Sequence, residues 1–174
     1  MTWLPYELHP ETPPEGVPLA ERFPPAQVEK MYSTLRARGE EFDLQFGPLH
    51  TLPNSRLALE TGEYARDRGC FQEFHEGMFR SYFSEGLDIG HFRVVAAVAA
   101  RCGLDAHAVK TVLESKIYAP RLKATREEAR SYGLTGIPTF IIGGRFKIVG
   151  AQPLENLRSV LVKAQDAYME GSNE

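Results

Sequence analysis

The segment from Thr135 to Val149 places the strongest constraint on the fold of this chain. Pro138 opens an apolar strand, Thr139–Ile142, and Gly143-Gly144 turns the chain into a second strand, Phe146–Val149. Apolar runs joined by a two-glycine turn are typical of a β-hairpin. A hairpin by itself is only marginally stable in water, so this one must join a larger sheet or pack on helices.

Elsewhere the periodicity of apolar residues predicts a mainly helical chain. Residues 3–8 have enough aromatic and apolar character for a short strand, which Pro5 and Pro10 restrict to an edge or an irregular end. Loops are predicted at residues 9–25 and 46–53. The predicted order is a strand, a long block of helices, the hairpin and a last helix. The predicted helices cover residues 24–39, 54–69, 71–83, 90–101, 105–115 and 120–132, and the last begins at Pro153.

Several helix ends are marked by residue types that favour the first or last position of a helix. Gly39, Gly69, Gly103 and Gly133 follow helical patterns and are expected to end them. Asp105 is expected to cap the helix that follows it.

The most regular helical segment carries a stripe of aromatic side chains. Apolar residues recur along it at spacings of three and one, which builds one broad face. Such a stripe is far more typical of a packed core than of a cofactor-binding surface, so we expect it to be buried. His75 is expected to be a core histidine, with a pocket acid or base as the alternative. The face consists of Phe71, Phe74, His75, Met78, Phe79, Tyr82 and Phe83.

The composition fits one compact, cytoplasmic protein. A chain of 174 residues that is 43% hydrophobic can bury a core without splitting into independent units. A net charge of -3 and a pI near 6.0 argue against a nucleic-acid or membrane partner. No apolar run approaches the roughly 20 residues of a membrane helix, and residues 1–5 lack the features of a secretory signal.

The cysteines and histidines predict neither a disulfide framework nor a metal site. Cys70 and Cys102 stand far apart, in segments predicted to be helical, so they are expected to be free, half-buried thiols. The histidines show no metal-ligand spacing with either cysteine. The chain also contains no Cys-x-x-Cys motif and no phosphate-binding glycine loop.

Taken in order, several segments resemble the DsbA-like thioredoxin proteins, specifically the cytosolic FrnE-type branch close to the 2-hydroxychromene-2-carboxylate isomerases. No single segment is decisive, but together they cover nearly the whole chain in the family's order. The segments are Trp3-Leu4-Pro5-Tyr6-Glu7-Leu8-His9-Pro10, Pro53-Asn54-Ser55-Arg56-Leu57-Ala58, Phe74-His75-Glu76-Gly77-Met78-Phe79 with Tyr82-Phe83, Thr135-Gly136-Ile137-Pro138-Thr139-Phe140, and Gly150-Ala151-Gln152-Pro153.

The resemblance implies an α/β fold in which an all-helical domain is inserted into a thioredoxin-like sheet. Residues 1–45 and 134–174 would form a partial thioredoxin-like domain, and residues 46–133 the inserted helical domain. Similar proteins begin with a strand that ends in Cys-x-x-Cys, or in a serine-containing variant in the isomerases. This chain begins at what resembles their second strand, so we expect Met1 to mark an internal start, a misplaced gene start or a truncated form.

The expected substrate-binding residues are Ile137, Pro138, Thr139 and Asn54. On the residues alone, Pro138 fits a strand start with a trans bond, whereas the resemblance implies a cis Ile137–Pro138 bond beside the active site. The backbone edge there would bind an extended thiol-bearing peptide or glutathione through main-chain hydrogen bonds. Asn54 or Ser55 can cap the next helix; in an isomerase-like protein the Asn54 amide would instead point into the substrate cleft.

The missing central strand has a structural consequence. It would lie between the strand at residues 3–8 and the strand at residues 139–142, so its absence leaves two rows of backbone groups without partners. We expect the chain to pair its own strands, to borrow a segment from another chain, or to form a homo-oligomer at the exposed edges.

Three functions fit the resemblance. The first, which we favour, is membership of a thiol–disulfide oxidoreductase family, with this chain redox-inactive and without a catalytic residue. Cys70 and Cys102 match positions in the inserted helices and cannot inherit the catalytic role. The second is a glutathione-dependent isomerase or transferase of the 2-hydroxychromene-2-carboxylate isomerase type. The third is a non-catalytic thioredoxin-like binding module. No cofactor other than glutathione is expected.

Overall fold

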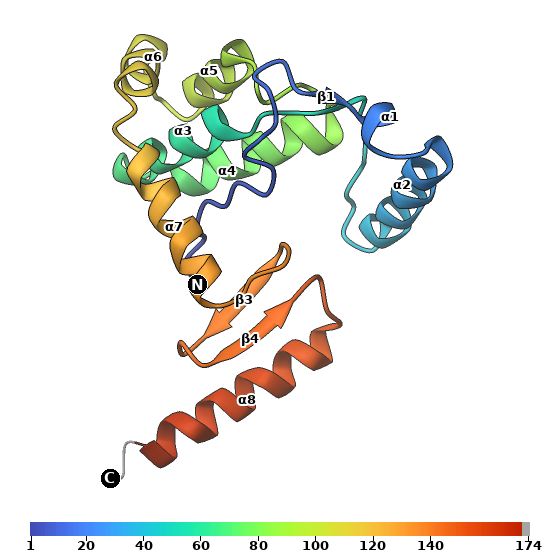
Figure 1. The fold of residues 1–174 in the computed structure, drawn as a ribbon, viewed down its shortest axis with the longest axis vertical. Helices are drawn as coiled ribbons and strands as arrows, with labels where there is room; N and C mark the ends of the chain where they lie inside the picture. Colours follow the sequence, from blue (N-terminus) through green and yellow to red (C-terminus); the bar gives the residue numbers. More distant parts are fainter. Residues whose placement is uncertain (172–174) are drawn as a thin grey trace. The chain divides into compact units, whose positions relative to one another are not determined.

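The computed structural model describes residues 1–171 and is a mixed α/β structure, mostly helical with two small sheets (Figure 1). The chain divides into two compact units, residues 1–126 and residues 127 onward, and each is described by itself. The predicted grouping of residues 1–45 with 134–174 stays a prediction, and residues 172–174 lie outside the described range. Among the described residues, no helix is both long and apolar enough to cross a membrane.

The helices follow the predicted order closely. Helix α7 (Ala119–Ser131) contains the boundary between the units, and the second unit continues with β3 (Thr139–Ile142), β4 (Phe146–Val149) and α8 (Leu154–Gly171). The first unit contains β1 (Val17–Pro18), α1 (Leu19–Arg22), α2 (Pro25–Glu40), β2 (Thr51–Leu52), α3 (Arg56–Asp67), α4 (Phe71–Phe79), the π-helix η1 (Arg80–Ser84), α5 (Phe92–Arg101) and α6 (Ala106–Ser115).

The predicted hairpin is confirmed with its predicted bounds. Strands β3 and β4 pair antiparallel, with Thr139 opposite Val149 and Ile142 opposite Phe146. Gly143 has a φ of 57°, in the left-handed region that glycine enters without steric cost. The glycine turn therefore fixes the register of the two strands.

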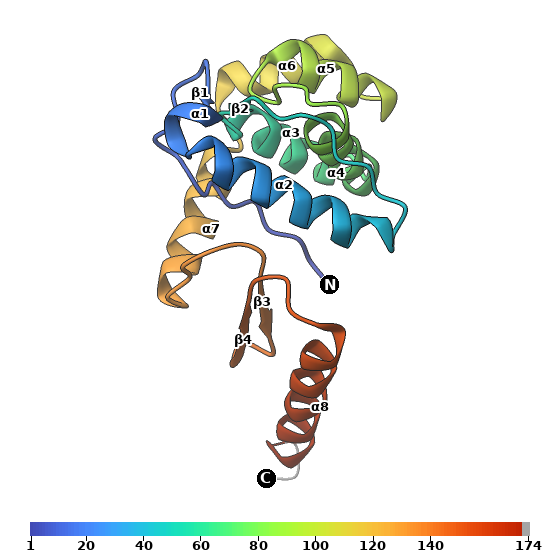
Figure 2. The same cartoon turned by 90° about the vertical axis from the view of Figure 1, so that its right-hand side faces the viewer.

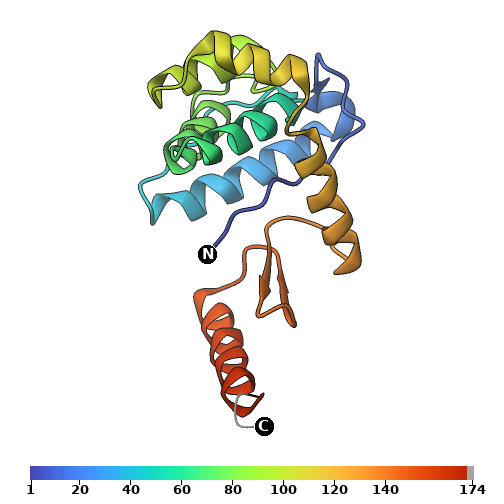
Figure 3. The ribbon, with the colours of Figure 1, turned by 90° about the vertical axis from the view of Figure 1, so that its left-hand side faces the viewer.

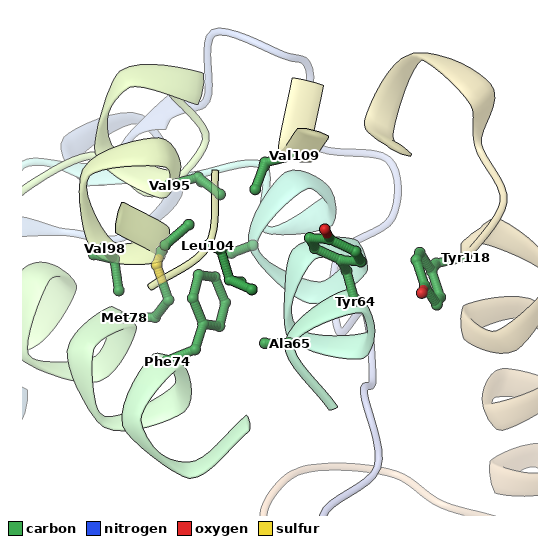
Figure 4. Close-up of a cluster of buried hydrophobic side chains, with 11 residues drawn as sticks. Tyr64, Ala65, Phe74, Met78, Val95, Val98, Leu104, Val109 and Tyr118 are labelled. Carbon is green, nitrogen blue, oxygen red and sulfur yellow. The ribbon is translucent and has the colours of Figure 1, made fainter. Parts of the chain in front are cut away.

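The core of the first unit lies among helices α3, α4, α5 and α6. Helix α3 contacts the other three, and Figures 2 and 3 show this group of helices from opposite sides. Figure 4 shows the buried side chains that meet there, including Phe74 and Met78 of α4 and Val98 of α5. The buried cluster consists of Ala58, Tyr64, Ala65, Phe74, Met78, Val95, Val98, Ala99, Leu104, Val109 and Tyr118.

The aromatic stripe is buried along only part of its width. Phe74 and Met78 belong to the core, as predicted, but Phe79 is 53% exposed. His75 is half-buried and lies between the rings of Phe71 and Phe79, at centroid distances of 5.3 and 4.6 Å. Burial lowers the pKa of His75, which favours the neutral ring. The prediction of one fully buried face is therefore wrong for the outer row of the stripe.

The predicted strand at residues 3–8 is wrong, because the structure has no strand there. Pro5 offers no N–H group to a ladder. The Trp3 carbonyl instead accepts a hydrogen bond from Arg66 Nη2 of α3 at 2.7 Å. The first unit's short sheet forms between the predicted loops, where Val17 lies opposite Leu52.

A buried carboxylate also holds the N-terminal segment. The Glu7 side chain is 4% exposed; its Oε1 accepts from Arg56 Nε at 2.9 Å, and its Oε2 accepts from Arg56 Nη2 at 3.0 Å and Arg126 Nη2 at 2.8 Å. Glu60 lies nearby and is buried too. Burial raises the pKa of Glu60, Arg56 partly opposes this effect, and Glu7 adds to it. The segment is thus fixed by charged side chains rather than by strand pairing.

Candidate functional site

The Pro138 corner, which consists of Gly136, Ile137, Pro138 and Thr139, opens strand β3 in the second unit. The Ile137–Pro138 peptide bond is cis. The Pro138 carbonyl accepts a hydrogen bond from the Gly150 N–H at 2.7 Å, and Thr139 Oγ1 donates to the Gly136 carbonyl at 2.7 Å. The side chains of Ile137 and Pro138 are exposed. Hydrogen bonds therefore hold the corner from within the unit, while two apolar side chains remain accessible.

The end of helix α7 positions the approach to this corner. Gly133 has a φ of 59°, and the Leu134 N–H donates to the Ala129 carbonyl at 3.0 Å, which is the six-to-one bond of a Schellman motif. The ammonium group of Lys147, on β4, donates a hydrogen bond to the Tyr132 carbonyl oxygen at 2.8 Å. The hairpin and the end of α7 are thereby joined inside one unit.

The outer edge of β3, defined here as the backbone groups of Thr139 and Ile141, lies next to the corner. Backbone groups alternate between the two sides of a strand. The Pro138 carbonyl bonds toward β4, so the groups of Phe140 point to β4 and those of Thr139 and Ile141 point away. Within residues 1–171 no third strand pairs with this sheet. Such an edge can accept an extended peptide as an added strand.

An open groove of about 370 Å³ lies between β4 and α8. Gln152 Nε2 donates a hydrogen bond to the Val149 carbonyl at 2.9 Å, and Asn156 Nδ2 donates one to Gln152 Oε1 at 3.4 Å. The amide groups of both side chains are therefore hydrogen-bonded inside the groove. No sequence signal predicts this groove, because its residues come from two elements with no shared spacing. It is lined by Lys147, Ile148, Val149, Gln152, Asn156, Ser159 and Val160.

Asn54, the fourth expected site residue, lies in the first unit just before α3. Its Nδ2 donates to the Thr12 carbonyl at 2.6 Å, and its Oδ1 accepts from the Arg56 N–H at 3.0 Å. Ser55 precedes the helix but makes no capping hydrogen bond through its side chain. Asn54 therefore accepts a backbone hydrogen bond at the start of α3, in line with its expected place at that helix end. A role in substrate binding stays a prediction.

Both thiols belong to the first unit. Cys70 directly precedes α4 and Cys102 directly follows α5, and both are free and half-buried, as expected. Neither cysteine belongs to the unit that contains the Pro138 corner. In the described part of the chain, no group of three or more His, Cys, Asp or Glu side chains could hold a metal ion.

Comparisons with known proteins agree with this architecture. A family model described as the DSBA-like thioredoxin domain matches residues 1–162. The uncharacterized protein YwbO of Bacillus subtilis (strain 168) is 28% identical over 147 residues, which covers 81% of this chain and 70% of YwbO. The crystal structure of a probable DsbA oxidoreductase from Streptomyces coelicolor is similar in fold, with a TM-score of 0.82 and 23% identity, over 92% of this chain and 73% of that protein.

Proposed function

The chain belongs to the family of DSBA-like thioredoxin domains, and we propose that it binds thiol-bearing peptides at the Pro138 corner without redox turnover. The observation that carries the proposal is the outer edge of β3 beside two exposed apolar side chains, Ile137 and Pro138. Main-chain pairing at such an edge gives affinity, and neighbouring side chains give selectivity. In this proposal the chain is an FrnE-type member of the family, acts in the cytoplasm and self-associates at open strand edges.

The absence of the paired-cysteine motif supports the absence of turnover. Disulfide exchange needs a thiolate that reaches the bound substrate and a second thiol that resolves the mixed disulfide. This sequence has no Cys-x-x-Cys, and burial raises the pKa of the Cys102 thiol, which lowers its thiolate fraction. The chain therefore lacks the closely spaced pair of thiols that such an exchange uses.

Insulin reduction tests redox inactivity. With dithiothreitol as electron donor, the full chain should precipitate the insulin B chain no faster than buffer does. A double variant, Cys70→Ser with Cys102→Ser, is the matched control and should give the same rate. Turnover by the wild type that the double variant loses would show that the proposal of redox inactivity is wrong.

Peptide binding tests the role of the outer edge. The probe is a fluorescein-labelled pentapeptide, Ala-Thr-Cys-Val-Ala, with blocked ends, and binding is followed by fluorescence polarisation. Thr139→Pro removes an N–H group from the outer edge and should weaken binding about tenfold, since one lost hydrogen bond costs about 1.4 kcal/mol. Its control is Val149→Pro, because Val149 faces Thr139 across the ladder and points its own N–H to the opposite edge.

An equal loss of peptide affinity in the two variants, or no loss in either, would contradict binding at the β3 edge. The same titration with reduced glutathione tests the isomerase alternative. Glutathione that binds at least as tightly as the peptide, and competes with it, would favour a glutathione-dependent enzyme. Peptide binding without glutathione binding would favour the binding module.

A further inference from the structure

The outer row of the aromatic stripe forms a continuous series of ring contacts along α4 and η1. The His75 ring lies 5.3 Å from that of Phe71 and 4.6 Å from that of Phe79, measured between ring centroids. The Phe79 ring in turn lies 5.6 Å from that of Phe83. Residues four apart are neighbours on a helix surface, so these rings follow one another along one side of the helix.

Rings from two other segments extend this row. Trp3 of the N-terminal segment lies 5.2 Å from His75, and Phe46 of the loop before β2 lies 6.2 Å from Phe83. Segments far apart in the sequence thus contribute to one aromatic surface of the first unit. This surface, called the aromatic ladder below, consists of Trp3, Phe46, Phe71, His75, Phe79 and Phe83.

The aromatic ladder is accessible to solvent, although its position is fixed. Phe79 is 53% exposed and Trp3 is 38% exposed, whereas Phe74 and Met78 of the same helix point into the core (Figure 4). Arg66 of α3 holds one end of the ladder, because its Nη2 donates a hydrogen bond to the Trp3 carbonyl. Contiguous apolar patches on a protein surface often mark interaction sites. The ladder is therefore a docking surface that is already formed before a partner binds.

Two opposite charges flank the ladder and indicate its partner. Glu76 and Arg80 are exposed, one helical turn apart, on the opposite side of Phe79 from Met78. A twofold axis at the height of Met78 would pack α4 against α4 of a second copy in the opposite direction. Glu76 of each copy would then face Arg80 of the other, and the two Phe79 rings would meet at the centre. The charge pattern of this face is therefore complementary to itself.

We propose that the aromatic ladder is the interface of a weak homodimer, in which α4 packs antiparallel on α4 of a second copy. Aromatic side chains are frequent anchors at the centre of protein interfaces, and polar groups form the rim around them. Phe79 supplies the centre here, and the pairs of Glu76 with Arg80 supply the rim. One helix and its neighbours offer a small area, so we expect a dissociation constant in the micromolar range. This interface does not depend on peptide binding at the Pro138 corner.

Sedimentation velocity of the full chain over a range of concentrations tests the dimer. The wild type should pass from monomer to dimer as its concentration rises. Phe79→Ala should raise the dissociation constant about tenfold or more, because it truncates the central anchor. Ile117→Ala is the matched control and should leave the constant unchanged, since Ile117 is 63% exposed in the same unit but lies outside the ladder. Far-UV circular dichroism checks that both variants are folded.

Charge exchange tests the antiparallel arrangement. Arg80→Glu should raise the dissociation constant about tenfold, because like charges then face each other twice across the twofold axis. Glu76→Arg should have a similar effect for the same reason. The double variant, Glu76→Arg with Arg80→Glu, restores both pairs of opposite charge. Its dissociation constant should return to within about threefold of the wild-type value.

Other outcomes would overturn the ladder dimer. A wild type that stays monomeric would leave the ladder to another occupant, such as an apolar helix of a different protein. Equal effects of Phe79→Ala and Ile117→Ala, or a double charge variant no better than the single ones, would also decide against it. Thr139→Pro separates this interface from association at the β3 edge. A dimer that Thr139→Pro disrupts and Phe79→Ala leaves intact would overturn the ladder dimer, whereas the reverse would support it and contradict association at strand edges.

Discussion

Replacing Phe74 by alanine is expected to lower the free energy of unfolding of the first unit by about 3–5 kcal/mol. Phe74 is 1% exposed and lies in the cluster formed by α3, α4, α5 and α6. Removing its ring loses the free energy gained by burying a large apolar side chain away from water. It also leaves a cavity that the neighbouring helices fill only in part. Urea denaturation followed by Trp3 fluorescence measures this cost, because Trp3 is the sole tryptophan and its ring lies 5.2 Å from that of His75.

Phe79→Ala is the matched control for this prediction. Phe79 is the same residue type on the same helix, but it is 53% exposed, so its loss should cost no more than about 1 kcal/mol. Far-UV circular dichroism should give the same midpoint as fluorescence for both variants. Similar losses from the two substitutions would mean that the outer row of the stripe is as buried as the inner row, as the sequence alone predicts.

Local signals predicted much of this fold because their causes are local. Asp105 caps α6 as expected, with its Oδ1 accepting from the Ala108 N–H at 2.8 Å. Gly69, Gly103 and Gly133 all adopt positive φ at helix ends. In each case the preference belongs to one residue and its immediate neighbours, so sequence order was enough to predict it.

The misses share a different cause. The aromatic spacing predicted which side chains share a face, but the burial of Phe74 and the exposure of Phe79 depend on which helices cover that face. In the candidate site, Pro138 was identifiable because proline restricts its own backbone, whereas the nearby groove was not.

Mutation can show whether residues 3–8 are held by the observed ion pairs of Glu7 or by the strand pairing that the sequence predicts. Replacing Arg56 and Arg126 together by methionine is expected to destabilise the first unit by about 3 kcal/mol, because the buried Glu7 carboxylate loses both guanidinium partners. We take the low end of the usual cost, since the two arginines are partly exposed and water will reach Glu7 in their absence. Urea denaturation followed by Trp3 fluorescence again measures the change.

A triple variant separates lost charge pairing from lost packing. Adding Glu7→Met to the two arginine substitutions removes the unpaired charge, and it should restore most of the stability, because apolar groups of similar size often replace a buried ion pair at little cost. Hydrogen exchange of the amides in residues 3–8 should quicken in the double variant and slow again in the triple variant. A strand ladder would hold those amides through backbone bonds, so unchanged exchange in the double variant would favour the predicted strand over the charged contacts described here.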